Sequence, residues 1–389
     1  MADNCKRTPL SWAAGAGHEA VVNLLLSHQN VNPNITDMEG RTPLSWAASY
    51  GRDGVVKQLL GREDVNPNLS DNIGRSPVFW ATLVRVHYRA LKQLLECGDV
   101  NPNTADNQGE TPLFGAVLRG NYQAAQILLE REDIAPNIAN IVGDTPLLIA
   151  VKDKSHRLVK LLLRSEDVNP NITDYVHYTP LHYAALLGDD EAVKLLLERA
   201  DLAPDILGEC CKTPLATAAK YGYEGVVELL LGCQNVNPNI TDIQGRTPLS
   251  WAAASGHNGV VQLLLQREDI NPNIPDNAGR TPLWWASFSG YAGTVNLLQA
   301  HRSGNSMEVW LPQNKISTTA SLEFPFVSSH RFPAERDYTF ASFVGAPVSI
   351  YLPYLSNNGT RRTCSRAATW LRQRQSFENR WRQSCQAPR

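Results

Sequence analysis

Apolar and polar residues follow a regular pattern through residues 37–68. A polar stretch at 37–41 precedes Thr42-Pro43, a pair that favours a helix start because threonine caps free backbone N–H groups and proline lacks one. Apolar residues then recur at helical spacing in 44–48 and again in 55–60, with a glycine between the two sets. Pro67 prevents a helix in the segment that follows. The pattern predicts a turn, two short helices and a loop.

This pattern occurs nine times along the chain. Successive copies lie 34 residues apart, apart from one interval of 35, and their first helices open at Thr8, Thr42, Ser76, Thr111, Thr145, Thr179, Thr213, Thr247 and Thr281. A fixed period of this length is typical of stacked repeats, in which each unit buries its apolar faces against its neighbours. We therefore expect an array over residues 1–301, with repeats starting near 3, 37, 71, 106, 140, 174, 208, 242 and 276.

A period of 34 also occurs in tetratricopeptide repeats, which do not open their first helix with Thr-Pro-Leu after a glycine-containing turn. The pattern Asp-x-x-Gly-x-Thr-Pro-Leu-x-x-Ala-Ala-x-x-Gly, followed by Val-x-x-Leu-Leu, resembles the ankyrin repeat across residues 3–301. The resemblance implies an all-α solenoid of about nine helix-turn-helix units with β-hairpin finger turns, whose first helices line a concave face. The form Asp-Val-Asn-Pro-Asn-Ile-Thr-Asp is similar to that of ankyrin arrays in filamentous fungi.

Charge divides the chain into two parts. Residues 1–300 hold 24 Lys and Arg against 33 Asp and Glu, whereas residues 301–389 hold 12 against 5. The period also stops near residue 301, so we predict that 302–389 is a basic, disordered tail. The uncharged segment 338–360 is a poor membrane span because it contains prolines, a glycine and several polar residues.

Composition and motifs argue against catalysis. The 389 residues are 43% hydrophobic, which excludes disorder of the whole chain, and they show no phosphate-binding loop, catalytic triad or metal-ligand spacing. The seven cysteines are scattered, and we interpret them as reduced thiols in a cytoplasmic or nuclear protein. The sequence therefore predicts a protein that is not an enzyme and needs no cofactor or metal.

Repeats three to six depart most from the shared pattern. One residue is inserted within 83–88 of the third repeat, which predicts a longer turn between its helices. Large apolar or aromatic residues stand at turn and first-helix positions where other repeats have polar or small ones, and such side chains often anchor protein interfaces. The candidate partner-binding residues are Phe79, Phe114, Ile141, Val142, Leu148, Tyr175, Val176, Tyr178, His182 and Trp284. The recurring tryptophan of the first helix, as at Trp46, is instead interpreted as core between repeats.

The preferred hypothesis is a monomeric scaffold that binds partner proteins through the concave face and the finger turns. A second hypothesis is the sensor arm of a longer NACHT/NLR-like signalling ATPase, whose nucleotide-binding motif would lie outside this sequence. A third is binding of nucleic acid or acidic lipid through residues 361–389, which hold eight arginines and one glutamate. The acidic array argues against nucleic acid on the concave face.

Overall fold

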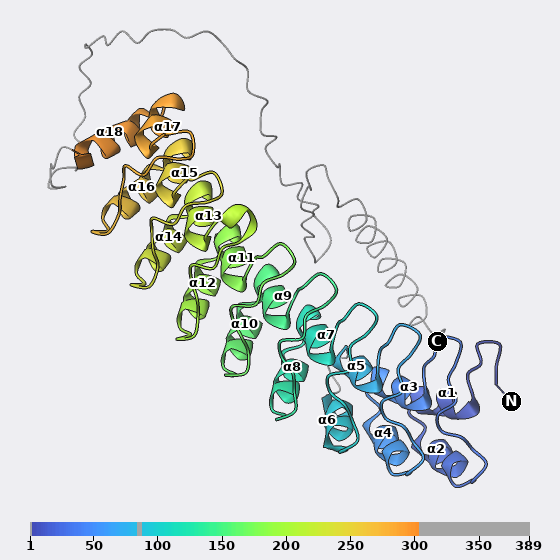
Figure 1. Cartoon of the computed structure of the whole chain (residues 1–389). Coiled ribbons are helices and arrows are strands. Elements are labelled where there is room, and N and C mark those ends of the chain that lie inside the picture. The colour runs from blue at the N-terminus through green and yellow to red at the C-terminus, as the bar shows by residue number, and fades with distance from the viewer. Residues whose placement is uncertain (1, 84–87, 303–389) are drawn as a thin grey trace. The chain divides into compact units, whose positions relative to one another are not determined.

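Nine pairs of helices make up the part of the chain that the structure, a computed structural model, describes, namely residues 2–83 and 88–302. Figure 1 shows the first helices in one row and the second helices in another, in chain order. The first helices are α1 (Pro9–Ala16), α3 (Pro43–Ser49), α5 (Pro77–Thr82), α7 (Pro112–Leu118), α9 (Pro146–Lys152), α11 (Pro180–Leu187), α13 (Pro214–Tyr221), α15 (Pro248–Ser255) and α17 (Pro282–Phe288). The second helices are α2 (Glu19–Leu26), α4 (Asp53–Leu60), α6 (Tyr88–Glu96), α8 (Tyr122–Leu129), α10 (His156–Leu163), α12 (Asp190–Leu197), α14 (Glu224–Leu231), α16 (Asn258–Leu265) and α18 (Ala292–Arg302).

Each first helix begins as its sequence predicts. In α3 the side chain of Thr42 accepts a hydrogen bond from the N–H of Ser45, and Pro43 occupies the first helical position. The same cap starts the other eight first helices, with Ser76 in place of threonine in α5. A cap of this kind is worth about 1 kcal/mol, which matters for helices of two turns.

Stacking of neighbours supplies the core. Each first helix contacts the first helix of the next repeat, and second helices contact each other in the same way. The apolar face of α4 is fully buried at Val55, Val56 and Leu59. Because the equivalent residues of repeats three to eight are buried too, the core runs between repeats through this part of the array. The all-α repeat array expected from the sequence is confirmed.

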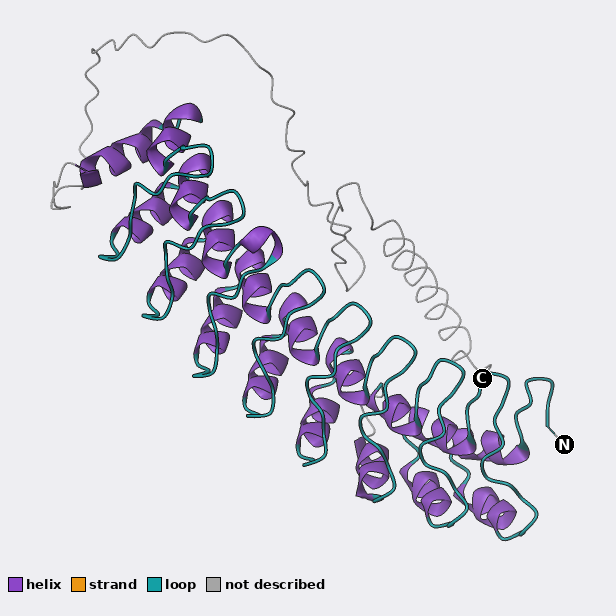
Figure 2. Cartoon of the chain, in the orientation of Figure 1, coloured by secondary structure: helices purple, strands orange, loops and turns teal. Residues whose placement is uncertain are grey.

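The turn that opens each repeat is here called a finger turn, and in every repeat but the seventh, which has Gly208 at this position, an acidic or amide side chain holds it. In the second repeat the N–H of Asp37 donates to the carbonyl of Arg41 over 3.0 Å, and the Asp37 carboxylate accepts from the N–H groups of Glu39 and Arg41. One backbone bond, from the N–H of Met38 to the carbonyl of Cys5, joins this turn to the previous one. A single backbone hydrogen bond between neighbouring turns does not make a β-ladder. The described residues therefore contain turns and no strand, as Figure 2 shows.

Asparagines link the loops at the other end of the repeats. The amide of Asn34 donates to the carbonyl of Asp64 over 2.6 Å and accepts from the N–H of Asn66 over 2.9 Å. The same pair of bonds recurs at Asn68, Asn103, Asn137, Asn171 and Asn239. We call this series of side chains the asparagine ladder. It provides hydrogen-bond partners for backbone N–H and C=O groups of the loops, which lie outside the helices.

Some expectations fall outside the described residues. The longer turn predicted for the third repeat involves residues 84–87, and nearly all of the predicted disordered tail lies beyond residue 302. Arg302 itself is helical and ends α18. Within the described part of the chain, every helix is too short or too polar to span a bilayer.

Candidate functional site

In six of the nine first helices the fourth residue ties the helix to its finger turn. The indole N–H of Trp46 donates to the second carboxylate oxygen of Asp37 over 2.9 Å, and Trp46 is buried. Trp12, Trp80, Trp251 and Trp285 make the same bond to the aspartate nine residues earlier. This tryptophan is therefore part of the framework, as its recurrence with the period suggests.

Arginine side chains extend this framework from repeat to repeat. The guanidinium of Arg41 lies 4.7 Å from the ring of Trp46 and 4.2 Å from that of Trp80, so it bridges two repeats. Arg246 lies 4.5 Å from both Trp251 and Trp285. Cation–π contacts of this kind are worth about 0.5–2 kcal/mol each. In repeats four to seven the sequence has other residues at the arginine position: Glu110, Asp144, Tyr178 and Lys212.

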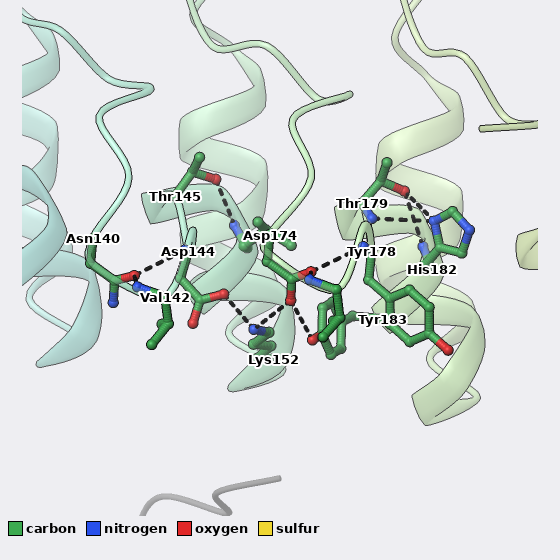
Figure 3. A network of polar contacts seen from close by, with 12 residues as sticks. Asn140, Val142, Asp144, Thr145, Lys152, Asp174, Tyr178, Thr179, His182 and Tyr183 are labelled. Carbon is green, nitrogen blue, oxygen red and sulfur yellow. Dashed lines mark hydrogen bonds and ion pairs between the residues drawn. The ribbon is translucent and has the colours of Figure 1, made fainter. Parts of the chain in front are cut away.

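Repeats five and six replace the arginine contacts with a polar network (Figure 3). The ammonium of Lys152 pairs with the carboxylate of Asp144 and lies 3.4 Å from that of Asp174. The hydroxyl of Tyr183 donates to the same Asp174 oxygen over 2.6 Å, which is the role that tryptophan has elsewhere. Burial raises the pKa of Asp144, and Lys152 opposes that effect. The network joins the finger turns of repeats five and six to α9 and α11.

The tips of these two finger turns carry exposed apolar side chains. Ile141 is 51% exposed, Val142 46% and Tyr175 73%, while Val176 is half-buried. We call these four residues the apolar finger patch. The turns that carry them are firmly held, because Asn140 accepts from the N–H groups of Val142 and Asp144 over 3.1 and 2.9 Å.

The two turns of the patch are also joined directly to each other. The N–H of Tyr175 donates to the carbonyl of Val142 over 3.4 Å. In turn six, Asp174 accepts from the N–H groups of Val176 and Tyr178 over 3.0 Å each. The structure therefore brings four of the sequence-predicted site residues together on adjacent, hydrogen-bonded turns.

Four other candidates are buried instead of exposed. Phe79, Phe114, Leu148 and His182 occupy the third position of their first helices, and each is at most 1% exposed. The expectation that they face a partner is wrong for this reason: the next repeat covers the third position. A Cβ atom on Gly115 would lie 3.0 Å from the tip of the Phe79 ring, so that ring fills the space next to the glycine.

The volumes of the two phenylalanines, Phe79 and Phe114, are matched by the next repeat. Where the third residue is small, as at Ser45, the fourth residue of the next repeat is tryptophan. Where the third residue is phenylalanine, the next fourth residue is Gly115 or Ile149. Because buried volume must be conserved for close packing, a large residue on one side requires a smaller one on the other. The signal was present in the sequence as a correlation across 35 or 36 residues.

His182 has a structural role at the start of α11. Its Nδ1 accepts from the N–H of Thr179 over 3.2 Å, and its Nε2 donates to the carbonyl of Lys212 over 3.1 Å. Burial lowers the pKa of His182 to about 4, so the ring is neutral. Tyr178, another candidate, is half-buried and stacks on the His182 ring with centroids 5.2 Å apart. Both rings lie against Gly208 of the next finger turn.

Trp284 is the one third-position residue with a substantial exposed surface, at 40%. It stacks on Phe288 with ring centroids 4.8 Å apart and meets Trp285 edge to face. Trp284 is exposed because no further repeat packs against α17 within the described chain.

Among the residues that the structure describes, His, Cys, Asp and Glu side chains form no group of three suited to a metal ion.

Comparisons with known proteins agree with this geometry. A family model described as ankyrin repeats (3 copies) matches residues 1–71, 52–140, 132–206 and 208–308. The crystal structure of the ankyrin repeat domain of Bcl-3, a unique member of the IkappaB protein family, is similar, with 26% identity and a TM-score of 0.52. The alignment covers 57% of this chain and 97% of that one.

A second solved structure, that of the ankyrin repeat protein EF0377, aligns with 24% identity and a TM-score of 0.46. It covers 49% of this chain and 97% of its own. None of the curated protein sequences matches the chain.

Proposed function

The chain belongs to the ankyrin-repeat family, whose domains are typically protein-binding modules, and we propose that it is a non-enzymatic scaffold that binds partner proteins through the finger turns of repeats five and six. The observation that carries the proposal is the apolar finger patch: Ile141, Val142 and Tyr175 are exposed on adjacent turns. Large apolar side chains on a preformed surface are the usual anchors of protein interfaces.

The patch differs from the other finger turns. Asn72, Asn107 and Asn277 stand where repeat five has Ile141 and repeat six has Tyr175, and each donates to a backbone carbonyl of the previous turn. Met38 and Ile243 are exposed at this position too, but each is followed by a polar residue. In the described chain, repeats five and six are the only neighbouring repeats in which both residues at the tip of the finger turn are apolar or aromatic.

Rigidity supports the same proposal. The backbone of both turns is held by the Asn140 and Asp174 side chains, and the Lys152 network fixes their position on the helices. A partner would therefore meet side chains that are already in place. Binding to such a surface loses less conformational entropy than binding to a mobile loop.

The proposal is tested with the full chain as bait. Partners captured by the wild type are identified, and the affinity of each is measured for a variant with Ile141→Ser and Tyr175→Ser. We expect a loss of at least about tenfold, since each lost anchor is worth about 1–2 kcal/mol.

The matched control changes Met38→Ser and Ile243→Ser, which are similarly exposed on other finger turns. It should leave affinity within about twofold of the wild type. Equal affinities for the wild type and the Ile141/Tyr175 variant would place the binding surface elsewhere.

The other hypotheses stay predictions. Binding of nucleic acid or acidic lipid through residues 361–389 concerns a part of the chain outside the described residues. The sensor-arm hypothesis, the likeness to fungal arrays, a monomeric state and a cytoplasmic or nuclear location also stay expectations of the sequence.

A further inference from the structure

The loop after each second helix has one position at which the repeats alternate. This position is arginine in repeats two, four, six and eight, namely Arg62, Arg131, Arg199 and Arg267. In repeats one, three, five and seven it is His28, Cys97, Ser165 and Cys233. The carbonyl of this residue accepts a hydrogen bond from the N–H three residues later in all eight loops, so the positions are structurally equivalent.

Each of these arginines reaches the second helix of the preceding repeat. The guanidinium of Arg267 donates to the carbonyl of Leu231, the last residue of α14, over 2.6 Å. Bonds of the same kind run from Arg62 to Leu26, from Arg131 to Leu95 and from Arg199 to Leu163. The last carbonyls of a helix lack a partner within the helix and lie at its negative dipole end, so a cation is favourable there. An even repeat thus caps the second helix of the odd repeat before it.

A carboxylate holds each guanidinium in place. Nε and Nη2 of Arg267 each donate to one oxygen of Asp269, over 2.9 and 2.7 Å. Two parallel charge-assisted bonds of this kind fix the plane of the guanidinium. We call such a pair a loop clamp, and the four clamps are Arg62–Asp64, Arg131–Asp133, Arg199–Asp201 and Arg267–Asp269. Their arginine side chains are 16–26% exposed, so the contacts are largely shielded from water.

A second set of contacts follows the same alternation at the turn between the two helices of a repeat. In all four of these even repeats, the residue before the second helix bonds to the preceding repeat. The contacts join Arg52 to Gly15, Asn121 to Thr82, Asp189 to His156 and His257 to Lys220, over 2.8–3.1 Å. Repeats seven and nine have tyrosines there, Tyr223 and Tyr291, whose rings lie against Gly188 and Gly256 of the preceding repeat.

Finger-turn contacts do not follow this alternation. The guanidinium of Arg41 lies against Trp80 between repeats two and three, and His182 donates to the carbonyl of Lys212 between repeats six and seven. Repeat four has Glu110 where repeat two has Arg41. The junction between repeats four and five therefore has no arginine of this kind at its finger turns.

The same junction differs at the loop and at the turn between the helices. Ser165 stands at the clamp position of repeat five, and Ser155 precedes α10. Repeat four instead uses Arg131 and Asn121 to contact repeat three. The junction of repeats four and five thus has neither the guanidinium nor the amide that join repeats three and four.

We propose that the array is built of two-repeat units, 1–2, 3–4, 5–6 and 7–8, and that it opens between units, first at the junction of repeats four and five. Local opening starts where the least free energy joins neighbours, and the loop clamps lie within units. This inference goes beyond the proposed function. The apolar finger patch lies on one unit, which the Lys152 network and the clamp of Arg199 hold together.

Hydrogen exchange of the full chain in increasing urea tests the proposal. We expect the amides of α6 and α8, which belong to one unit, to become exchangeable in a single opening, and those of α10 in a different one. In the Arg131→Ala variant α6 loses its cap, so its amides should exchange at least about tenfold faster. The matched control is Arg164→Ala, which removes an exposed arginine at the end of α10 and should change exchange by less than about twofold.

The converse variant adds a clamp to the junction of repeats four and five. Ser165→Arg places an arginine two residues before Asp167, as Arg131 stands before Asp133. It should slow exchange in α8 and α10 at least about threefold, a result that misfolding cannot produce.

Two outcomes would overturn the proposal. A single opening of α8 and α10 in the wild type would place no boundary between repeats four and five. Exchange in α6 that is equal in the wild type and the Arg131→Ala variant would show that the clamps do not join repeats.

Discussion

At the scale of single residues, His182 shows how a position that looks like a contact can be a part of the core. Its two ring nitrogens are both engaged, one as an acceptor and one as a donor, and this requires the neutral ring. The aromatic neighbour Tyr178 closes the site on one side. Protonation would remove the acceptor and place a charge in a buried site, which is why the pKa is lowered.

This gives a prediction for pH dependence. The pKa of His182 is about 4 in the folded protein and near 6.5 when unfolded, so the unfolded chain binds the proton first as pH falls. The contribution of the neutral ring to the free energy of unfolding is fully present above about pH 6.5. It decreases as the pH falls from about 6.5 to about 4, by up to about 3 kcal/mol. In the His182→Gln variant, which keeps an acceptor and a donor without titrating, this loss should be absent. Urea unfolding from about pH 7 to pH 4 measures it, and parallel profiles for the two proteins would contradict the assignment.

Asp205 interrupts the asparagine ladder. It accepts from the N–H of Asn237 over 2.8 Å, as an asparagine would. Its other oxygen is buried without a hydrogen-bond partner, at the place where the asparagines donate to a carbonyl. Burial raises the pKa of Asp205, and the hydrogen bond from Asn237 opposes that effect.

We therefore predict that Asp205→Asn stabilises the protein. An amide can donate where the carboxylate cannot, and the gain should be about 1 kcal/mol at neutral pH. Because the pKa of Asp205 is raised in the folded state, the wild type recovers stability as pH falls through that pKa, and the advantage of the variant shrinks. Thermal unfolding of both proteins at neutral and acidic pH tests this, with Asn171→Asp as the reverse change that should destabilise.

The sequence indicates some of these residues and not others. Thr42, Pro43 and the fixed period predict helix starts because capping depends on neighbouring residues only. The burial of His182 and Phe79 depends on the next repeat, some 35 residues away. The residue type at one position therefore does not predict whether that position is buried. Ile141, Val142, Tyr175 and Val176 lie on turn tips, where the chain itself predicts exposure, and three of these side chains are well exposed.

At the scale of elements, the contact between consecutive first helices is set by paired volumes. Phe79 on α5 fills the space that Gly115 leaves on α7, whereas Ser45 on α3 is followed by Trp80 on α5. Helices of two turns have little stability of their own, so their spacing depends on such fits. The sequence predicted these helices but not that their divergent residues compensate for one another.

A double-mutant cycle tests the pairing. Phe79→Ser alone leaves a cavity and should cost about 3–5 kcal/mol, and Gly115→Trp alone overpacks the same space. The double variant recreates the serine and tryptophan combination of the consensus repeats, so it should be more stable than the sum of the single changes by at least about 2 kcal/mol. Chemical denaturation of the four proteins measures the coupling, and additive costs would show that the two residues are independent.

At the scale of the whole array, each repeat is supported by the repeats on either side. The helix contacts, the single bond between finger turns and the asparagine ladder all join neighbours. Stability in such an array is close to a sum of local and nearest-neighbour contributions. The period alone predicts this behaviour, because it requires only that equivalent faces stack.

A core change in one repeat should consequently act over a short range. Leu128 of α8 is fully buried, and Leu128→Ala should cost about 2–5 kcal/mol. Hydrogen exchange should accelerate in α5 to α10 and stay close to wild type in α15 and α16. Uniform acceleration along all the described helices would show instead that the array unfolds as one unit.

The paired volumes also bear on how such a gene can change by recombination. In repeats one, two and eight the third residue of the first helix is a serine, and the fourth residue of the first helix in the next repeat is a tryptophan. Unequal crossing-over among these repeats therefore keeps the serine and tryptophan pair at every junction. Loss of repeat three as a unit would set Ser45 against Gly115, and loss of repeat five would set Phe114 against Tyr183. The divergent repeats are thus bound to be inherited together, and a protein engineer who transplants them must move the block from Phe79 to Thr217 intact.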